Sequence, residues 1–167
     1  YQILGNRIYD KNHKESQLDE IEGLGILDIE SEFIREEKIV KQSLATFELG
    51  LNDESDQIHE IFSKINGEEV AGYELHEGTT NLLSANPLFK IKKGMGNNNE
   101  GIFDGAYQNN VFGTYFHGIF NNYNLRRELL NHIRKNKGLE IRTGDDPYET
   151  SVESSLEKLA NIVEDSL

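Results

Sequence analysis

Hydrophobic and polar residues recur along the chain with two different periods, which predict strands and helices in alternation. Apolar runs with β-branched and aromatic residues predict strands at residues 39–47, 70–76 and 87–92. A shorter buried strand is expected within residues 23–29, where two glycines precede an apolar run. Polar stretches and stretches rich in Gly and Asn predict loops, at residues 52–56, 78–80 and 94–99.

A β-hairpin is the clearest local prediction, within residues 106–117. Two strand-like runs flank Asn109 and Asn110, a pair that tolerates the positive φ angles of two-residue hairpin turns. Side chains alternate between the two faces of a strand, so we expect Tyr115 and His117 to share one face of the second strand. His117 would then lie at the end of that strand.

Apolar residues at helical spacing predict three helices. The first covers residues 58–65, the second begins at Asn122 or Asn124 and ends at Lys137, and the third begins at Asp146. An N-cap residue followed directly by proline, as at Asp146, is typical of a helix start. The apolar stripes of the second and third helices are Leu125, Leu129, Leu130 and Ile133, and Val152, Leu156, Leu159 and Val163.

Strands interleaved with helices predict an α/β fold, and no repeat or composition shift divides residues 1–167, so we expect a single domain. The formal net charge is −13, from 17 basic and 30 acidic side chains, which argues against a nucleic-acid partner. No apolar run approaches the ~20 residues of a membrane span. A cytoplasmic protein without a membrane partner is therefore the expectation.

The candidate chemistry is limited by residue type and spacing. The chain has no Cys, which excludes disulfides, thiolate metal sites and a Cys nucleophile within these residues. None of the five His residues has a metal-ligand spacing, and the glycines at 94 and 96 lack the Lys-Ser/Thr of a phosphate-binding loop. His117 differs, because a strand end is where α/β folds place working residues and histidine titrates near neutral pH. The pattern alone favours a structural histidine there over a catalytic one.

Five blocks, in the same order, resemble the glutamine amidotransferase domain of the cobyric acid synthase family, a class I amidotransferase type. In this family the nucleophile stands in a C-G-G-[YF]-Q-x-L-G block, and residues 1–5 (YQILG) fit its end. The Cys is thus expected three residues before Tyr1, and the earlier strands of the domain are expected outside this chain. The five blocks are residues 23–30 (GLGILDIE), 72–80 (GYELHEGTT), 104–106 (DGA), 113–120 (GTYFHGIF) and 156–160 (LEKLA).

The resemblance implies a flavodoxin-like, mostly parallel sheet flanked by helices, and a Cys–His glutaminase. His117, at the matching position, would carry the protons, and Gln2 would lie near the glutamine substrate. The family passes the ammonia to a synthetase domain, where ATP and Mg²⁺ drive amidation of corrinoid carboxylates in cobalamin biosynthesis. No cofactor or metal is implied for this domain itself, and the chain without its Cys is expected to be inactive.

One position departs from most class I amidotransferases, which carry H-P-E with the Glu orienting the His. Here Gly118 and Ile119 follow His117, as in the resembled family, so its orienting partner stays open. Glu74 and His76 lie in a family block whose role is equally open between an ion pair, a turn contact and substrate binding. Two alternatives remain: the glutaminase subunit of a peptidoglycan amidotransferase partnered with a Mur-ligase-like protein, and a non-catalytic, degenerate amidotransferase module.

Overall fold

The computed structural model describes residues 1–34, 39–50 and 57–165. The chain divides into two compact units, residues 1–129 and 130–167. The expectation that residues 1–167 form a single domain stays a prediction. The loop expected at residues 52–56 lies outside the described residues.

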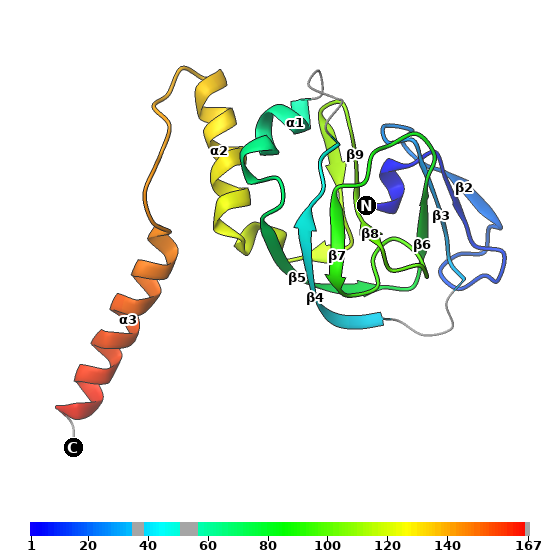
Figure 1. The fold of residues 1–167 in the computed structure, drawn as a ribbon. Coiled ribbons are helices and arrows are strands. Elements are labelled where there is room, and N and C mark those ends of the chain that lie inside the picture. Colours follow the sequence, from blue (N-terminus) through cyan, green and yellow to red (C-terminus); the bar gives the residue numbers. More distant parts are fainter. Residues whose placement is uncertain (35–38, 51–56, 166–167) are drawn as a thin grey trace. The chain divides into compact units, whose positions relative to one another are not determined.

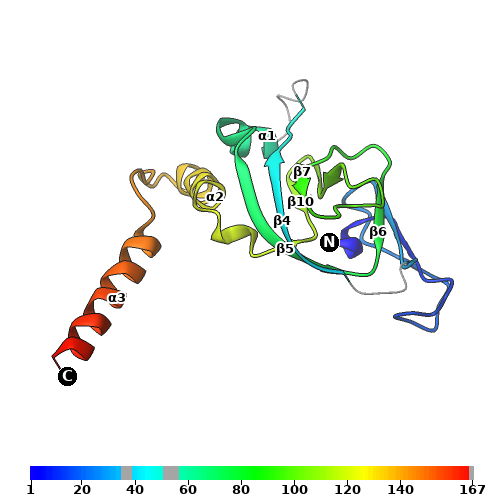
Figure 2. The same cartoon turned by 60° about the horizontal axis from the view of Figure 1, so that its bottom comes forward.

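The first unit holds two larger sheets and a hairpin (Figure 1). The strand orders are β2-β1-β3-β6, β11-β5-β4-β7-β8 and β10-β9. In both views the N-terminus lies between the two larger sheets (Figures 1 and 2). The elements are η1 (Gln2–Leu4), β1 (Arg7–Tyr9), β2 (Glu20–Glu22), β3 (Ile29–Glu32), β4 (Ile39–Phe47), α1 (Gln57–Phe62), η2 (Ser63–Ile65), β5 (Glu69–His76), β6 (Thr79–Leu82), β7 (Phe89–Lys93), β8 (Phe103–Asp104), β9 (Ala106–Gln108), β10 (Val111–Gly113), β11 (Phe116–His117) and η3 (Ile119–Asn121).

The predicted mixture of helices and strands is confirmed, but the predicted mostly parallel sheet is wrong for the described residues. Among the described strand pairs, β1 and β3 run parallel and the others run antiparallel. Parallel neighbours need crossover connections of a dozen or more residues. The links between β1 and β2, β7 and β8, and β9 and β10 are shorter than that, so the chain turns back directly.

Most predicted strands are present. Residues 39–47 form β4, residues 70–76 lie within β5, and residues 87–92 overlap β7. The loop at residues 94–99 is also confirmed. Two predictions are wrong: the run at residues 23–29 becomes a strand only at its last residue, and the expected turn at 78–80 opens β6.

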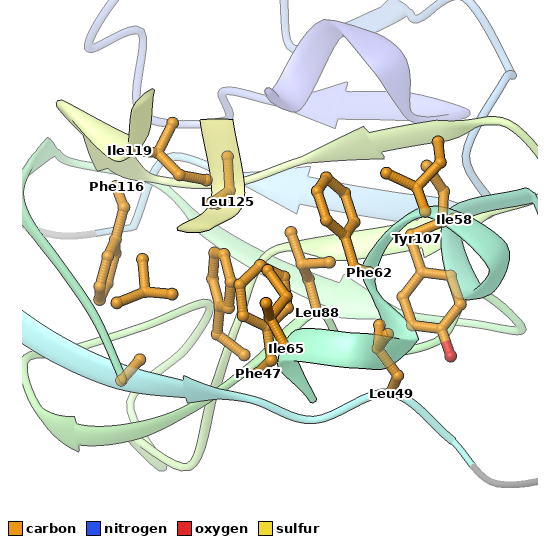
Figure 3. Packing of buried hydrophobic residues seen from close by; sticks show 14 residues of the cluster. Phe47, Leu49, Ile58, Phe62, Ile65, Leu88, Tyr107, Phe116, Ile119 and Leu125 are labelled. Atoms are coloured by element: carbon orange, nitrogen blue, oxygen red, sulfur yellow. The ribbon is translucent and has the colours of Figure 1, made fainter. Parts of the chain in front are cut away.

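The main core of the first unit lies between the five-stranded sheet and α1 (Figure 3). Ile58, Ile61, Phe62 and Ile65 are buried, which confirms the predicted helical stripe. The ring of Phe47 on β4 packs edge-on against the ring of Phe89 on β7, with ring centroids 4.9 Å apart. The buried members of this cluster include Phe47, Phe62, Leu88, Phe89, Tyr107, Phe116 and Leu125.

The predicted second and third helices are α2 (Tyr123–Asn136) and α3 (Pro147–Glu164). Gly138, with φ of 67°, follows the end of α2 and relieves the steric cost of a left-handed residue there. Asp146 caps α3 as predicted, because its carboxylate accepts a hydrogen bond of 3.0 Å from the amide of Tyr148. No helix in the described part of the chain is both long and apolar enough to cross a lipid bilayer.

Candidate functional site

Residues 1–5 form the N-terminal turn. They are held by residues 23–27, the glycine-rich block that follows β2. The amide of Leu24 donates to the carbonyl of Ile3 at 2.8 Å, and the amide of Gly25 donates to the carbonyl of Gly5 at 2.9 Å. A Cβ on Gly23 would overlap the Gly5 carbonyl, so the close approach requires glycine. These hydrogen bonds explain why residues 23–27 do not form the predicted strand: their amides serve the N-terminal turn.

Tyr1 and Gln2 bring two further blocks to the same place. The Tyr1 ring meets the Tyr115 ring edge-on, with centroids 5.0 Å apart. A Cβ on Gly113 would lie 2.5 Å from the Tyr1 ring. The Gln2 amide nitrogen lies so close to Gly78 that a Cβ there would overlap it, and this nitrogen is buried without a hydrogen-bond acceptor. Residues 1–5, 72–80 and 113–120 are therefore neighbours in space.

The predicted alternation across residues 113–117 is wrong, because the strand is interrupted. β10 pairs with β9 and ends at Gly113, whereas β11 starts at Phe116 and pairs with β5. As a result Tyr115 is buried and stacks on His76, while His117 is exposed and stacks on Tyr73. Tyr73 and His76 belong to opposite faces of β5, so Tyr115 and His117 do as well.

Glu74 on the buried face of β5 is a structural acceptor. Ser43 donates to its carboxylate at 2.5 Å, and the amides of Met95 and Gly96 donate at 2.8 and 2.6 Å. Burial alone would raise the pKa of Glu74, but these hydrogen bonds and the adjacent His76 lower the pKa to about 2. The Glu74 carboxylate already accepts from two amides of the glycine-rich loop at residues 94–99, so this loop does not fit a nucleotide phosphate.

His76 lies between Glu74 and the turn at Gly78. Its Nδ1 donates to the carbonyl of Gly78 at 2.8 Å, and its Nε2 lies 3.7 Å from Glu74 Oε1. The imidazole stacks on Tyr115 with centroids 3.7 Å apart. The Tyr115 hydroxyl is 2.7 Å from that of Thr80, and burial raises the pKa of Tyr115 to about 12. Of the interpretations left open for Glu74 and His76, the structure supports a turn contact, which His76 makes with the carbonyl of Gly78.

Asp104 is a second buried carboxyl, fully enclosed at the end of β8. Thr114 donates a short hydrogen bond to its Oδ2, and Oδ1 has no hydrogen-bond partner. Burial, reinforced by the negative charge of Glu74, raises the pKa of Asp104 to about 7 in spite of that hydrogen bond. Asp104 lies in the D-G-A block that the sequence comparison singled out, but no pattern along the chain predicted its hydrogen bond with Thr114.

His117 lies on the open face of the five-stranded sheet. Its ring stacks on Tyr73 with centroids 5.0 Å apart and an interplanar angle of 15°. Gly118 follows with φ of 75° and turns the chain into η3. Gln2 and His117, the two predicted site residues, have different neighbours, Gly78 for one and Tyr73 for the other. Their predicted roles stay predictions.

Comparison with known proteins identifies relatives over the whole chain. Residues 1–125 match the model of the CobB/CobQ-like glutamine amidotransferase domain. A probable cobyric acid synthase of Methanothermobacter thermautotrophicus is 45% identical over 100% of this chain and 32% of its own length. One from Methanocaldococcus jannaschii is 41% identical over 100% of the chain and 31% of its length. A cobyric acid synthase of Dehalococcoides mccartyi is 40% identical, again over 100% and 31%. The chain thus spans about a third of the length of the curated relatives it matches.

Proposed function

The chain belongs to the CobB/CobQ-like glutamine amidotransferase family, and on that premise we propose that it forms part of a cytoplasmic cobyric acid synthase. In this proposal it contributes to the domain that hydrolyses glutamine and releases ammonia. The 167 residues contain no Cys, so the proposal requires a nucleophilic Cys that is not among them. The observation that carries the proposal is the accessible His117 imidazole at the end of β11, inside the block that resembles the family's histidine block.

The proposed reaction is acyl transfer through a thioester. The Cys thiolate attacks the side-chain amide carbon of glutamine, the carbon–nitrogen bond breaks, and ammonia leaves. His117 takes the thiol proton, gives it to the leaving nitrogen and then activates the water that hydrolyses the thioester to glutamate. Gln2, in the block that resembles the end of the family's Cys block, contributes to glutamine binding. Backbone amides near the Cys stabilise the oxyanion.

The acceptor side of the proposal follows the relatives, which are cobyric acid synthases by name. Ammonia would pass to a synthetase domain that uses ATP and Mg²⁺ to amidate corrinoid carboxylates. The glycine-rich loop at residues 94–99 does not fit the ATP phosphates, because the amides of Met95 and Gly96 already donate to the Glu74 carboxylate. We therefore assign no ATP step to this chain.

Glutamate release by the full-length protein tests the assignment of His117. We expect His117→Ala to lower kcat by about 10²- to 10⁴-fold, the usual contribution of a general acid–base. His13→Ala is the matched control, because His13 is exposed and pairs with Asp19 at the surface. Unchanged turnover in His117→Ala would remove His117 from the mechanism.

The acceptor is tested with glutamine carrying ¹⁵N in its side-chain amide, together with ATP and Mg²⁺. We expect ¹⁵N to appear in a corrinoid amide, detected by mass spectrometry. Transfer to a peptidoglycan precursor instead would support the Mur-ligase-partnered alternative. No glutamate release from a full-length protein that carries another residue at the Cys position would support the non-catalytic module.

A further inference from the structure

A chain of hydrogen bonds leads from Asp104 to the residue before His117. The Thr114 hydroxyl donates to Asp104 Oδ2 and accepts from the amide of Phe116 at 3.0 Å. Because the hydroxyl has a single proton, the donation to the carboxylate leaves its lone pairs directed at the amide. Phe116 is buried in the core and lies opposite Glu74 in the sheet register. The backbone between Thr114 and His117 is therefore fixed at both ends.

Asp104 is itself held in place from a third segment. The Asn97 side chain accepts from the amide of Gly105 at 2.9 Å and donates to the Gly105 carbonyl at 2.9 Å. Gly105 has φ of 68°, and a Cβ there would lie 2.6 Å from the carbonyl of Gly113. The D-G-A turn is thus clamped on one side by Asn97 and packed on the other against the end of β10.

A carboxyl in this position is unfavourable for folding at neutral pH. Asp104 is enclosed, it lies near the negative charge of Glu74, and its pKa is raised to about 7. Other titratable groups around it are His76 of β5, Tyr1 at the N-terminus and Tyr115 beside Thr114. Buried acids with perturbed pKa values concentrate at functional sites. Asp104 is hydrogen-bonded to Thr114, in the block that carries His117, so a role for Asp104 would concern this histidine.

We propose that Asp104 is a positioning residue for His117, acting through the Thr114 hydroxyl and the Phe116 amide. It takes the place of the orienting carboxylate that follows the histidine in other class I amidotransferases, but it acts on the backbone rather than on the imidazole. The proposal rests on the proposed function for its effect on catalysis. Its effect on the position of the His117 ring is independent of that function.

The test compares Thr114→Val, which keeps the shape but removes the hydroxyl, with Thr114→Ser, which keeps the hydroxyl. In the full-length protein we expect Thr114→Val to lower kcat for glutamate release by ~10- to 100-fold, the cost of a misplaced catalytic group. KM for glutamine should stay within ~3-fold, because His117 moves protons rather than binding the substrate. Thr114→Ser should restore kcat to within ~3-fold, and Thr143→Val, at an exposed threonine, is the control.

A second readout is the NMR signal of the His117 ring, assigned by its loss in His117→Ala. We expect it to shift in Thr114→Val and to return in Thr114→Ser. Wild-type kcat together with an unmoved ring signal in Thr114→Val would overturn the proposal. If His117→Ala keeps its glutaminase activity, the proposed function fails, and the ring signal alone then decides the positioning role.

Asp104→Asn provides a comparison that does not depend on the fold of Thr114→Val. An amide oxygen still accepts from the Thr114 hydroxyl, so we expect kcat to stay within ~3-fold of wild type. Asp104→Leu, which has no acceptor, should lose kcat as Thr114→Val does. A tenfold or larger loss in Asp104→Asn would mean that the charge matters rather than the hydrogen bond, and it would contradict the proposal.

Discussion

The two faces of β5 carry residues from one sequence block but have opposite environments. On the inner face, Glu74 and His76 are buried and make hydrogen bonds to several other segments. On the outer face, Tyr73 and Leu75 are 47% and 38% exposed, and Tyr73 supports the ring of His117. The difference shows that one block serves two purposes: its inner side chains join β5 to β4, to the loop at residues 94–96 and to the turn at Gly78, and its outer Tyr73 stacks on the accessible histidine.

The largest expected effect is at the inner face. Glu74→Leu removes the acceptor for Ser43 and for the amides of Met95 and Gly96, so we expect a loss of more than about 3 kcal/mol in the free energy of unfolding. Urea denaturation followed by circular dichroism measures this loss. Glu69→Leu on the same strand is the control: Glu69 is exposed in an ion pair with Lys92, and its loss should cost less than about 1 kcal/mol. Equal losses would contradict the comparison.

The pH dependence of stability sharpens the same contrast. The pKa of Glu74 is lowered to about 2 in the folded protein, and an unfolded Glu titrates near 4. The unfolded state therefore binds more protons between these values, so the stability present above pH ~4.5 is lost as the pH falls toward 2. We expect a loss of a few kcal/mol over this range, measured as the urea midpoint at each pH. Glu74→Gln should flatten the curve there, and an unchanged slope would disprove the assignment.

A smaller effect is expected from apolar residues. Val70 on the inner face of β5 is 1% exposed, whereas Val40 on β4 is 70% exposed. Val70→Ala should cost about 2 kcal/mol, from two buried methyl groups and the cavity they leave. Val40→Ala should change stability by less than about 0.5 kcal/mol. Thermal unfolding of the two variants gives the measurement, and a large effect at Val40 would mean that the outer face is covered.

Local signals in the sequence predicted local structure well. Asn109 has φ of 58° in the predicted hairpin turn, Asp146 caps the predicted third helix, and Ile58 begins the buried stripe of the first. Each of these features depends on residues a few positions apart. The strand break after Gly113 was not predictable in this way, because the Thr114 hydroxyl bonds a carboxylate ten residues earlier and the chain changes sheets there.

The candidate site was predictable only in part. Residue blocks singled out Gln2 and His117 as site residues and left the role of Glu74 and His76 open, and the sequence could not assign the faces on which these side chains lie. Face depends on register, and the register of β11 is set by pairing with β5 across more than forty intervening residues. The inner cluster of His76 with Tyr115, and the partners of Asp104, follow from that pairing and from the packing of separate segments.

The glycines at 23, 78 and 113 have a consequence for how the first residues are held. Each leaves room for an atom of the N-terminal turn that a single methyl group would displace. The position of the N-terminal turn therefore depends on the missing side chains of these glycines as well as on its hydrogen bonds. At Gly23 the opposing atom is a backbone oxygen that no substitution can remove, whereas at Gly78 and Gly113 it belongs to the side chain of Gln2 or Tyr1, so only these two contacts can change together with their partners.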